Sequence, residues 1–111
     1  MAVPQLLLLA LSGCVPECGL RERLTRVLVR QTADGLALFC KEQRRPPDRL
    51  AELAPPECEG ARCVLKELRS DSWEHPLVLQ KYPGRVEVLS VGADGQLGTS
   101  DDLVVSVPCG R

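Results

Sequence analysis

Apolar residues in the first half of the chain recur at helical spacing. Between Gly19 and about Arg44 they occupy one side of a helical wheel, namely Leu20, Leu24, Val27, Leu28, Leu36 and Phe39. This pattern predicts an amphipathic helix that ends before Pro46-Pro47, because proline cannot continue a helix. Gly35 weakens its centre by about 1 kcal/mol relative to alanine, which makes residues 33–35 the place for a kink or break.

The second half of the chain holds three short β-branched runs, at residues 77–80, 85–91 and 103–107. Val and Leu in such runs suit a pleated, half-buried surface, and Pro83-Gly84 marks the turn between the first two. An N-terminal helix followed by three strands predicts an α+β fold. In it, the helix packs on a small three-stranded antiparallel sheet.

Two features lie between the helix and the strands. Residues 47–54 predict a second, short helix capped by Asp48 and ended by Pro55-Pro56, with Leu50 and Leu53 facing the core. Trp73, the only tryptophan, is expected to pack in the core against the first helix, with a binding role as the alternative.

The N-terminal residues resemble a targeting segment. The apolar run Leu6–Leu11 leads into Leu11-Ser-Gly-Cys14, which fits a bacterial lipobox whose cysteine is diacylated. The run is too short to span a membrane and has the length of a signal-peptide core, although no Lys or Arg precedes it. We therefore expect a lipoprotein signal peptide at 1–13, lipidation at Cys14 and a domain at 14–111. An ordinary secretory signal cut near the same point is the alternative.

The cysteines bear on stability and compartment. With 111 residues and 3% aromatic residues, the core is thin and calls for a staple such as a disulfide or a metal. Six cysteines indicate an oxidising compartment or metal binding. Cys58 and Cys63 are the first disulfide candidates, and Cys40 with Cys109 the second. Lipidation of Cys14 would leave five cysteines and one free thiol, whereas three bridges would form without it. A zinc ribbon needs Cys-x-x-Cys pairs, which the chain lacks.

An acidic, glycine-rich loop separates the last two predicted strands. Asp94, Asp101 and Asp102 would repel one another in a tight loop, and a hard divalent cation would remove that repulsion. Calcium accepts carboxylate and carbonyl oxygens in irregular loops, and the glycines at 92, 95 and 98 allow carbonyls to turn inward. The alternative is a solvated acidic hairpin loop, since Asp-Gly is itself a turn signal.

Three segments resemble the major pseudopilin of type II secretion systems. Ser90-Val-Gly-Ala-Asp-Gly with Ser100-Asp-Asp is similar to the family's C-terminal S-L-G-x-D-G and D-D signature. Asp71-Ser-Trp-Glu-His-Pro76 is similar to its D-P-W-G-N-P, with Ser72, Glu74 and His75 as departures. Tyr82-Pro-Gly84 is similar to its S-P-G. The resemblance covers residues 20 to 105.

The resemblance implies a calcium site and a mode of anchoring. Calcium would be held by the side chains of Asp94, Asp101 and Asp102 and by the backbone carbonyls of Val91 and Ser100. Family members keep a long apolar helix that anchors the subunit and forms the filament core. The chain has no such helix between Cys14 and Leu20. A fatty-acid anchor would replace it, and we do not expect polymerisation by helix stacking.

These expectations define a non-enzymatic, lipid-anchored, calcium-stabilised component of type II secretion. Its partners would be proteins of the secretion apparatus and a membrane, in the cell envelope, as a periplasmic or outer-membrane lipoprotein. The alternative is a stand-alone extracytoplasmic lipoprotein that binds calcium or another ligand. A net charge of −1 and scattered aromatic residues argue against nucleic-acid binding. His75, the only histidine, lies in a predicted turn and does not suggest a catalytic triad.

Overall fold

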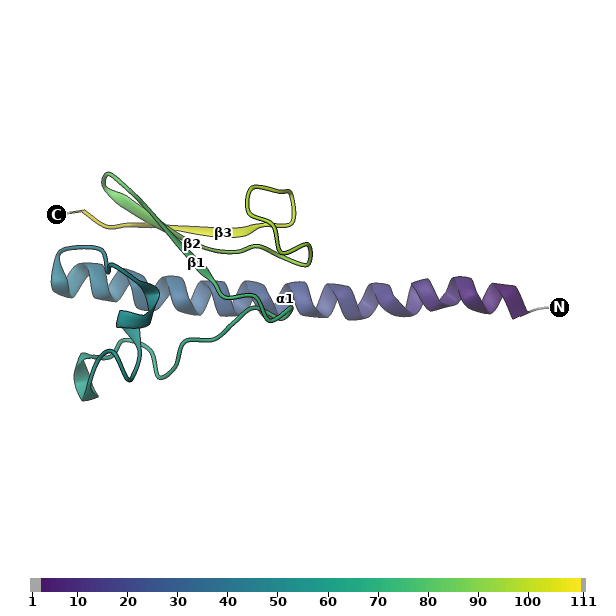
Figure 1. Cartoon of the computed structure of the whole chain (residues 1–111), viewed down its shortest axis with the longest axis horizontal. Coiled ribbons are helices and arrows are strands. Elements are labelled where there is room, and N and C mark those ends of the chain that lie inside the picture. Colours follow the sequence, from purple (N-terminus) through teal and green to yellow (C-terminus); the bar gives the residue numbers. More distant parts are fainter. Residues whose placement is uncertain (1–2, 111) are drawn as a thin grey trace.

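The computed structural model describes the backbone of residues 3–110 and the side chains of residues 19–110. Its dominant element is one 41-residue helix, α1 (Val3–Gln43). Figure 1 shows that the C-terminal half of α1 lies beside the sheet, whereas its N-terminal part projects alone. Within the part of the chain that the structure describes, no helix combines the length and the apolar character needed to cross a bilayer.

The helix is longer than the sequence predicts and does not break at Gly35. It begins at Val3 rather than near Gly19. A Cβ added at Gly35 would lie 2.7 Å from Leu65 Cδ2, so the missing side chain makes room for Leu65. The cost of about 1 kcal/mol for one glycine is small against a long cooperative helix that packs on a neighbour. The side chains of the predicted signal peptide and of Cys14 lie outside the described set.

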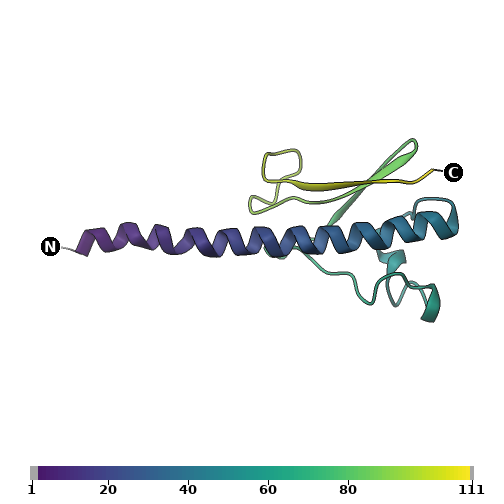
Figure 2. The ribbon, with the colours of Figure 1, turned by 180° about the vertical axis from the view of Figure 1, so that it is seen from behind.

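Three antiparallel strands form the sheet, as predicted. They are β1 (Val78–Tyr82), β2 (Arg85–Ser90) and β3 (Leu103–Pro108), in the order β1-β2-β3. Val88 in the central strand pairs with Leu79 on one side and with Val105 on the other. Seen from behind, in Figure 2, the strands again lie along one side of α1. The α+β fold is therefore confirmed.

The core lies between α1 and the sheet, and the helix presents a different face to it than the sequence predicts. Leu36 and Phe39 are buried as expected, together with Val29, Ala33 and Cys40 from α1 and Val86, Val88 and Val107 from the sheet. The predicted core residues Leu20, Leu24 and Val27 are instead exposed. Small residues, among them Thr25 and Ala33, lie in the buried stripe, where they allow the helix to pack closely on the neighbouring segments. In the N-terminal part of this stretch the bulky residues Leu20, Leu24 and Val27 lie outside the buried stripe.

The segment from residue 44 to 77 contains no second α-helix. It has two 3₁₀ turns, η1 (Leu50–Leu53) and η2 (Gly60–Arg62). Leu50 and Leu53 are buried, as predicted. Asp48 does not cap the turn. Instead, the Glu52 carboxylate accepts the backbone N–H groups of Asp48, at 2.6 Å, and Arg49, at 3.2 Å. With prolines on both sides, the segment is too short for more than one turn.

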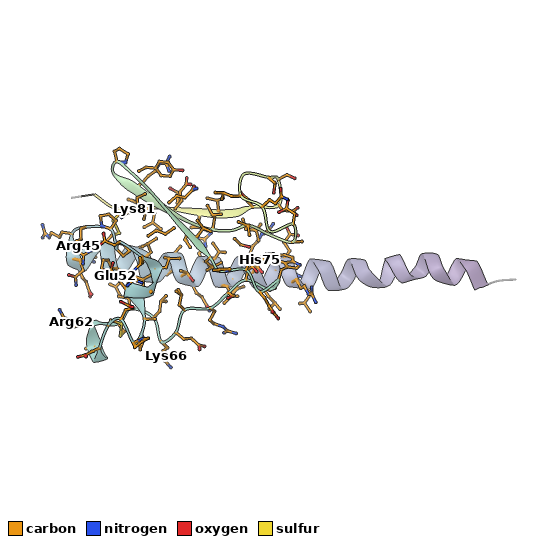
Figure 3. All side chains as sticks on the ribbon, in the orientation of Figure 1. Arg45, Glu52, Arg62, Lys66, His75 and Lys81 are labelled. Carbon is orange, nitrogen blue, oxygen red and sulfur yellow. A yellow bond between two sulfur atoms is a disulfide. The ribbon has the colours of Figure 1, made fainter. Side chains whose placement is uncertain are left out.

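Both predicted disulfides form. Cys58–Cys63 closes the loop around η2, and Cys40–Cys109 joins the end of α1 to the chain just after β3. Figure 3 shows the described side chains between α1 and the sheet and along the 44–77 segment. The bridges supply the staple that a core with few aromatic residues needs.

Candidate functional site

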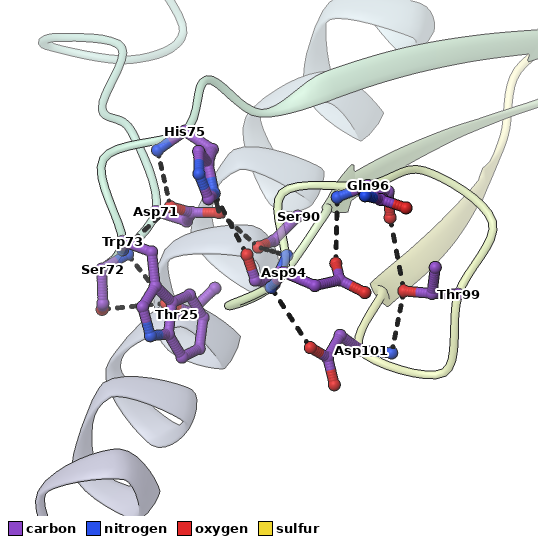
Figure 4. A network of polar contacts seen from close by, with 11 residues as sticks. Thr25, Asp71, Ser72, Trp73, His75, Ser90, Asp94, Gln96, Thr99 and Asp101 are labelled. Carbon is purple, nitrogen blue, oxygen red and sulfur yellow. Dashed lines mark hydrogen bonds and ion pairs between the residues drawn. The ribbon is translucent and has the colours of Figure 1, made fainter.

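The candidate site is the loop of residues 91–102 between β2 and β3, at the end of the sheet that lies near the middle of α1 (Figure 1). Its two exposed carboxylates are bound to backbone groups of the same loop. Asp94 Oδ1 accepts the Gln96 N–H at 2.9 Å, and Asp101 Oδ2 accepts the Asp94 N–H at 3.3 Å (Figure 4). The loop thus places Asp94 and Asp101 side by side with one oxygen of each engaged.

Asp102 differs from the other two aspartates because it is partly buried. Its Oδ2 accepts the Gly98 N–H at 2.8 Å, whereas its Oδ1 is buried with no hydrogen-bond partner among the described residues. A buried carboxylate oxygen without a partner costs free energy, and native proteins almost always satisfy such atoms. This oxygen is therefore an open acceptor in the candidate site.

The other two predicted ligands also belong to this loop. Val91 is buried at the end of β2 and Ser100 is exposed beside Asp101. All five predicted ligands thus lie within twelve residues of one another. Among the described residues, however, no three His, Cys, Asp or Glu side chains are arranged as a group that could hold a metal ion.

Gly92 fixes the base of the loop. Its φ is 74°, and a Cβ at this position would collide with the backbone carbonyl of Asp101. The two ends of the loop are therefore in contact at Gly92 and Asp101, and only glycine adopts this conformation at position 92 without strain. This contact brings Asp101 and Asp102 close to the end of β2.

A buried aspartate that the sequence reasoning did not single out supports the loop. The Asp71 side chain is fully buried, and its Oδ1 accepts the backbone N–H groups of Trp73, at 2.9 Å, and His75, at 2.8 Å. Its Oδ2 accepts the Ser90 hydroxyl at 2.6 Å, and Ser90 Oγ accepts the Gly92 N–H at 3.0 Å. The sequence feature that could have identified Asp71 is its place at the start of a turn, where an Asp carboxylate commonly accepts hydrogen bonds from nearby backbone N–H groups.

The same turn is bound to α1 and to the loop. Thr25 on α1 donates its hydroxyl to Ser72 Oγ at 2.8 Å and accepts the Ser72 N–H at 3.0 Å. His75 Nδ1 lies 3.1 Å from the Gly92 carbonyl and donates to it in the tautomer that carries the proton on Nδ1. Figure 4 shows the resulting continuous polar network from the helix to the loop.

Trp73 does not lie in the core, contrary to the prediction. Its side chain is half-buried and lines a hollow of about 210 Å³ with Glu22, Ala93, Ser100 and Asp101. The turn held by Asp71 directs the indole toward the loop, because the adjacent Ser72 is bound to Thr25 on α1. His75, which the sequence placed in a turn, is partly exposed and contributes a contact to the loop.

The Asp94 carboxylate is stabilised in its ionised form. The backbone N–H of Gln96 lowers the pKa of Asp94 below its usual value, and the Thr99 hydroxyl and the nearby His75 ring act in the same direction. The loop therefore presents an anionic oxygen at any pH near neutrality.

The fold and this loop define a class, that of small pseudopilin-like domains. The sequence model of the family described as "Type II secretion system (T2SS), protein G" matches residues 23–106. This match covers most of the chain, and the chain belongs to this family. Comparison with curated proteins and with solved structures gave no match.

Membership in the family supports a role in type II secretion of the kind that pseudopilins fulfil, which is structural rather than enzymatic. It also implies protein partners within a secretion apparatus and a location in the cell envelope or periplasm. The matched range spans α1 from Arg23, strands β1 and β2, the 91–102 loop and β3 as far as Ser106.

Proposed function

We propose that this protein is a lipid-anchored, calcium-stabilised structural or accessory component of type II secretion. The observation that carries the calcium part is the buried Oδ1 of Asp102, for which the described part of the chain supplies no hydrogen-bond partner, in a loop with two further carboxylates. The family match carries the secretion part. The protein would present its sheet and helix to other proteins of the apparatus.

Calcium suits the chemistry of this donor set. The residues that would hold it are Asp94, Asp101 and Asp102, with the carbonyl groups of Val91 and Ser100. All of these groups supply the oxygen ligands that calcium prefers. Bound calcium would give the Asp102 oxygen a partner and offset the repulsion among the three carboxylates. Because the loop joins β2 to β3, its occupation would stabilise the sheet against unfolding.

Melting experiments test the calcium site. We expect excess chelator to lower the melting temperature of the protein, and added calcium to raise it by several degrees, as expected for a ligand that binds only the folded state. Asp102→Asn should abolish the calcium response, whereas Asp34→Asn, on the exposed side of α1, should leave it intact. An identical melting curve in calcium and in chelator would contradict the site.

The proposal of a lipid anchor is supported by Leu11-Ser-Gly-Cys14. We expect cells that express the full chain to incorporate labelled fatty acid into the protein, and Cys14→Ala to abolish the labelling. Cys18→Ala is the matched control and should retain it. Mass spectrometry of the mature N-terminus would show a modified Cys14 as residue one. Labelling that persists in Cys14→Ala would contradict the lipobox.

Capture of partners separates the secretion role from a stand-alone lipoprotein. Crosslinking in intact cells followed by purification should recover proteins of the type II secretion apparatus. Recovery of none of them, from a protein that still melts with calcium dependence, would favour the stand-alone alternative.

A further inference from the structure

A ridge of half-exposed aliphatic side chains runs along α1 between β3 on one side and residues 69–72 of the 44–77 segment on the other. Leu20, Leu24 and Val27 are 48%, 51% and 53% exposed. Their spacing of four and three residues places them in one line on the helix surface. Val104 on β3 is 48% exposed, and it lines the same groove as Val27. Contiguous exposed apolar surface of this kind marks a site of interaction.

A groove between α1 and the edge strand β3 extends this apolar surface. It has a volume of about 400 Å³, and its lining includes Val27 and Val29 from the helix and Leu103, Val104 and Val105 from the strand. The guanidinium-bearing Arg26 and Arg30 also line it. An aliphatic groove flanked by cations matches a hydrocarbon chain with an anionic head.

The flanks of the ridge are basic. Residues 20–31 contain four arginines and one acidic residue, although the whole chain has a net charge of −1. Arg26 pairs with Glu22 at 3.1 Å in an exposed position. Arg23 and Arg30 are exposed and form no ion pair with any residue that the structure describes. Asp34, the next acidic side chain, lies beyond the end of this segment.

Aliphatic residues flanked by arginines suit a lipid surface better than a protein partner. Long guanidinium side chains reach phosphate groups while their methylene stems lie along apolar surface. Hot spots of protein interfaces are enriched in Trp and Tyr as well as in Arg, and the residues that form the ridge and line the groove include arginines but no aromatic side chain. A helix lying flat would also bring the projecting N-terminal part of α1 to the same plane (Figure 1).

We propose that the face of α1 from Leu20 to Gln31, together with Val104, lies on an anionic phospholipid surface. The cationic flanks contact lipid headgroups, and the ridge and groove contact acyl chains. The proposal rests on the envelope location of the protein and is independent of calcium. It adds a second membrane contact to whatever holds the N-terminus.

Vesicle sedimentation with the full chain tests this face. We expect binding to phosphatidylglycerol vesicles to exceed binding to phosphatidylcholine vesicles by roughly tenfold or more, and to weaken with salt. Arg23→Glu/Arg30→Glu should remove this preference. Arg62→Glu/Lys66→Glu, at exposed positions on the 44–77 segment, should retain it. Because all variants have the same N-terminus, any binding through that end contributes equally to each of them and does not affect the difference between variants.

Fluorescence quenching by brominated acyl chains tests contact with the bilayer interior. In a Trp73→Phe background, Val27→Trp should be quenched strongly, and Leu97→Trp, equally exposed on the 91–102 loop, should not. Equal binding to both vesicle types, or unchanged preference in Arg23→Glu/Arg30→Glu, would overturn the proposal. So would an unquenched Val27→Trp, or self-association that Val27→Asp abolishes in the absence of lipid.

Discussion

At the scale of single residues, Asp71 organises more of the molecule than any of the predicted site residues. Its carboxylate joins the turn at 71–75 to Ser90 at the end of β2, and the neighbouring Ser72 joins that turn to α1. Burial of this carboxyl group is tolerated because all three donors satisfy its oxygens. Sequence reasoning missed Asp71 because its burial and its contact with Ser90 depend on the packing of segments far apart in the chain.

Asp71→Ala should destabilise the protein strongly. It leaves the Ser90 hydroxyl and two backbone N–H groups without their acceptor, and we expect a loss of about 3 kcal/mol in the free energy of unfolding. Urea denaturation at neutral pH measures this loss, with Asp34→Ala as the exposed control. Because the two residues are coupled, Asp71→Ala should cost less in a Ser90→Ala background. Equal costs in both backgrounds would show that the contact with Ser90 carries no stability.

At the scale of elements, the sequence predicted the sheet better than the helix. Alternating β-branched runs and Pro83-Gly84 located the strands to within a few residues, because strand pattern and turn chemistry are local signals. Helical periodicity gave the element but not its buried face. Leu24 and Thr25 are adjacent, and hydrophobicity alone ranks the exposed leucine above the buried threonine. The loop carboxylates were located by sequence, whereas their relative arrangement depends on backbone contacts such as that of Gly92 with Asp101.

The contact of Gly35 with Leu65 predicts the effect of enlarging this residue. Gly35→Val would place side-chain atoms where Leu65 now lies, and overpacking of this kind costs about 1–3 kcal/mol. Ala37→Val, on the exposed side of the same helix, controls for the lower helix propensity of valine. Chemical denaturation should therefore show a larger loss for Gly35→Val. Equal losses would mean that Leu65 moves aside at no cost.

At the scale of the whole molecule, an elongated helix carries a small domain at one end. The molecule extends 65 Å along its longest axis, and only the C-terminal half of α1 contacts the sheet. With few aromatic residues in its core, such a domain gains stability from covalent bridges. The sequence suggested both bridges, including a link from the end of the helix to the C-terminal tail, and the fold places Cys109 directly after β3.

The two disulfides should contribute unequally to stability. Cys40–Cys109 spans 69 residues and Cys58–Cys63 spans five. In the chain-entropy description their removal costs about 4 and about 2 kcal/mol respectively. Thermal melts of Cys40→Ala/Cys109→Ala and Cys58→Ala/Cys63→Ala would measure the difference. A larger loss from the short bridge would indicate that strain or unfolded-state structure outweighs loop length.

The long bridge also bears on when the polypeptide reaches its final form. Cytoplasmic thiols are kept reduced, so the disulfide between Cys40 and Cys109 does not form there. Before the Cys40–Cys109 bridge forms, the chain is less constrained, which suits passage through a narrow export channel. Oxidation on the far side of the membrane then locks the tertiary structure in place, and a cell without a thiol oxidase should accumulate this protein in a protease-sensitive state.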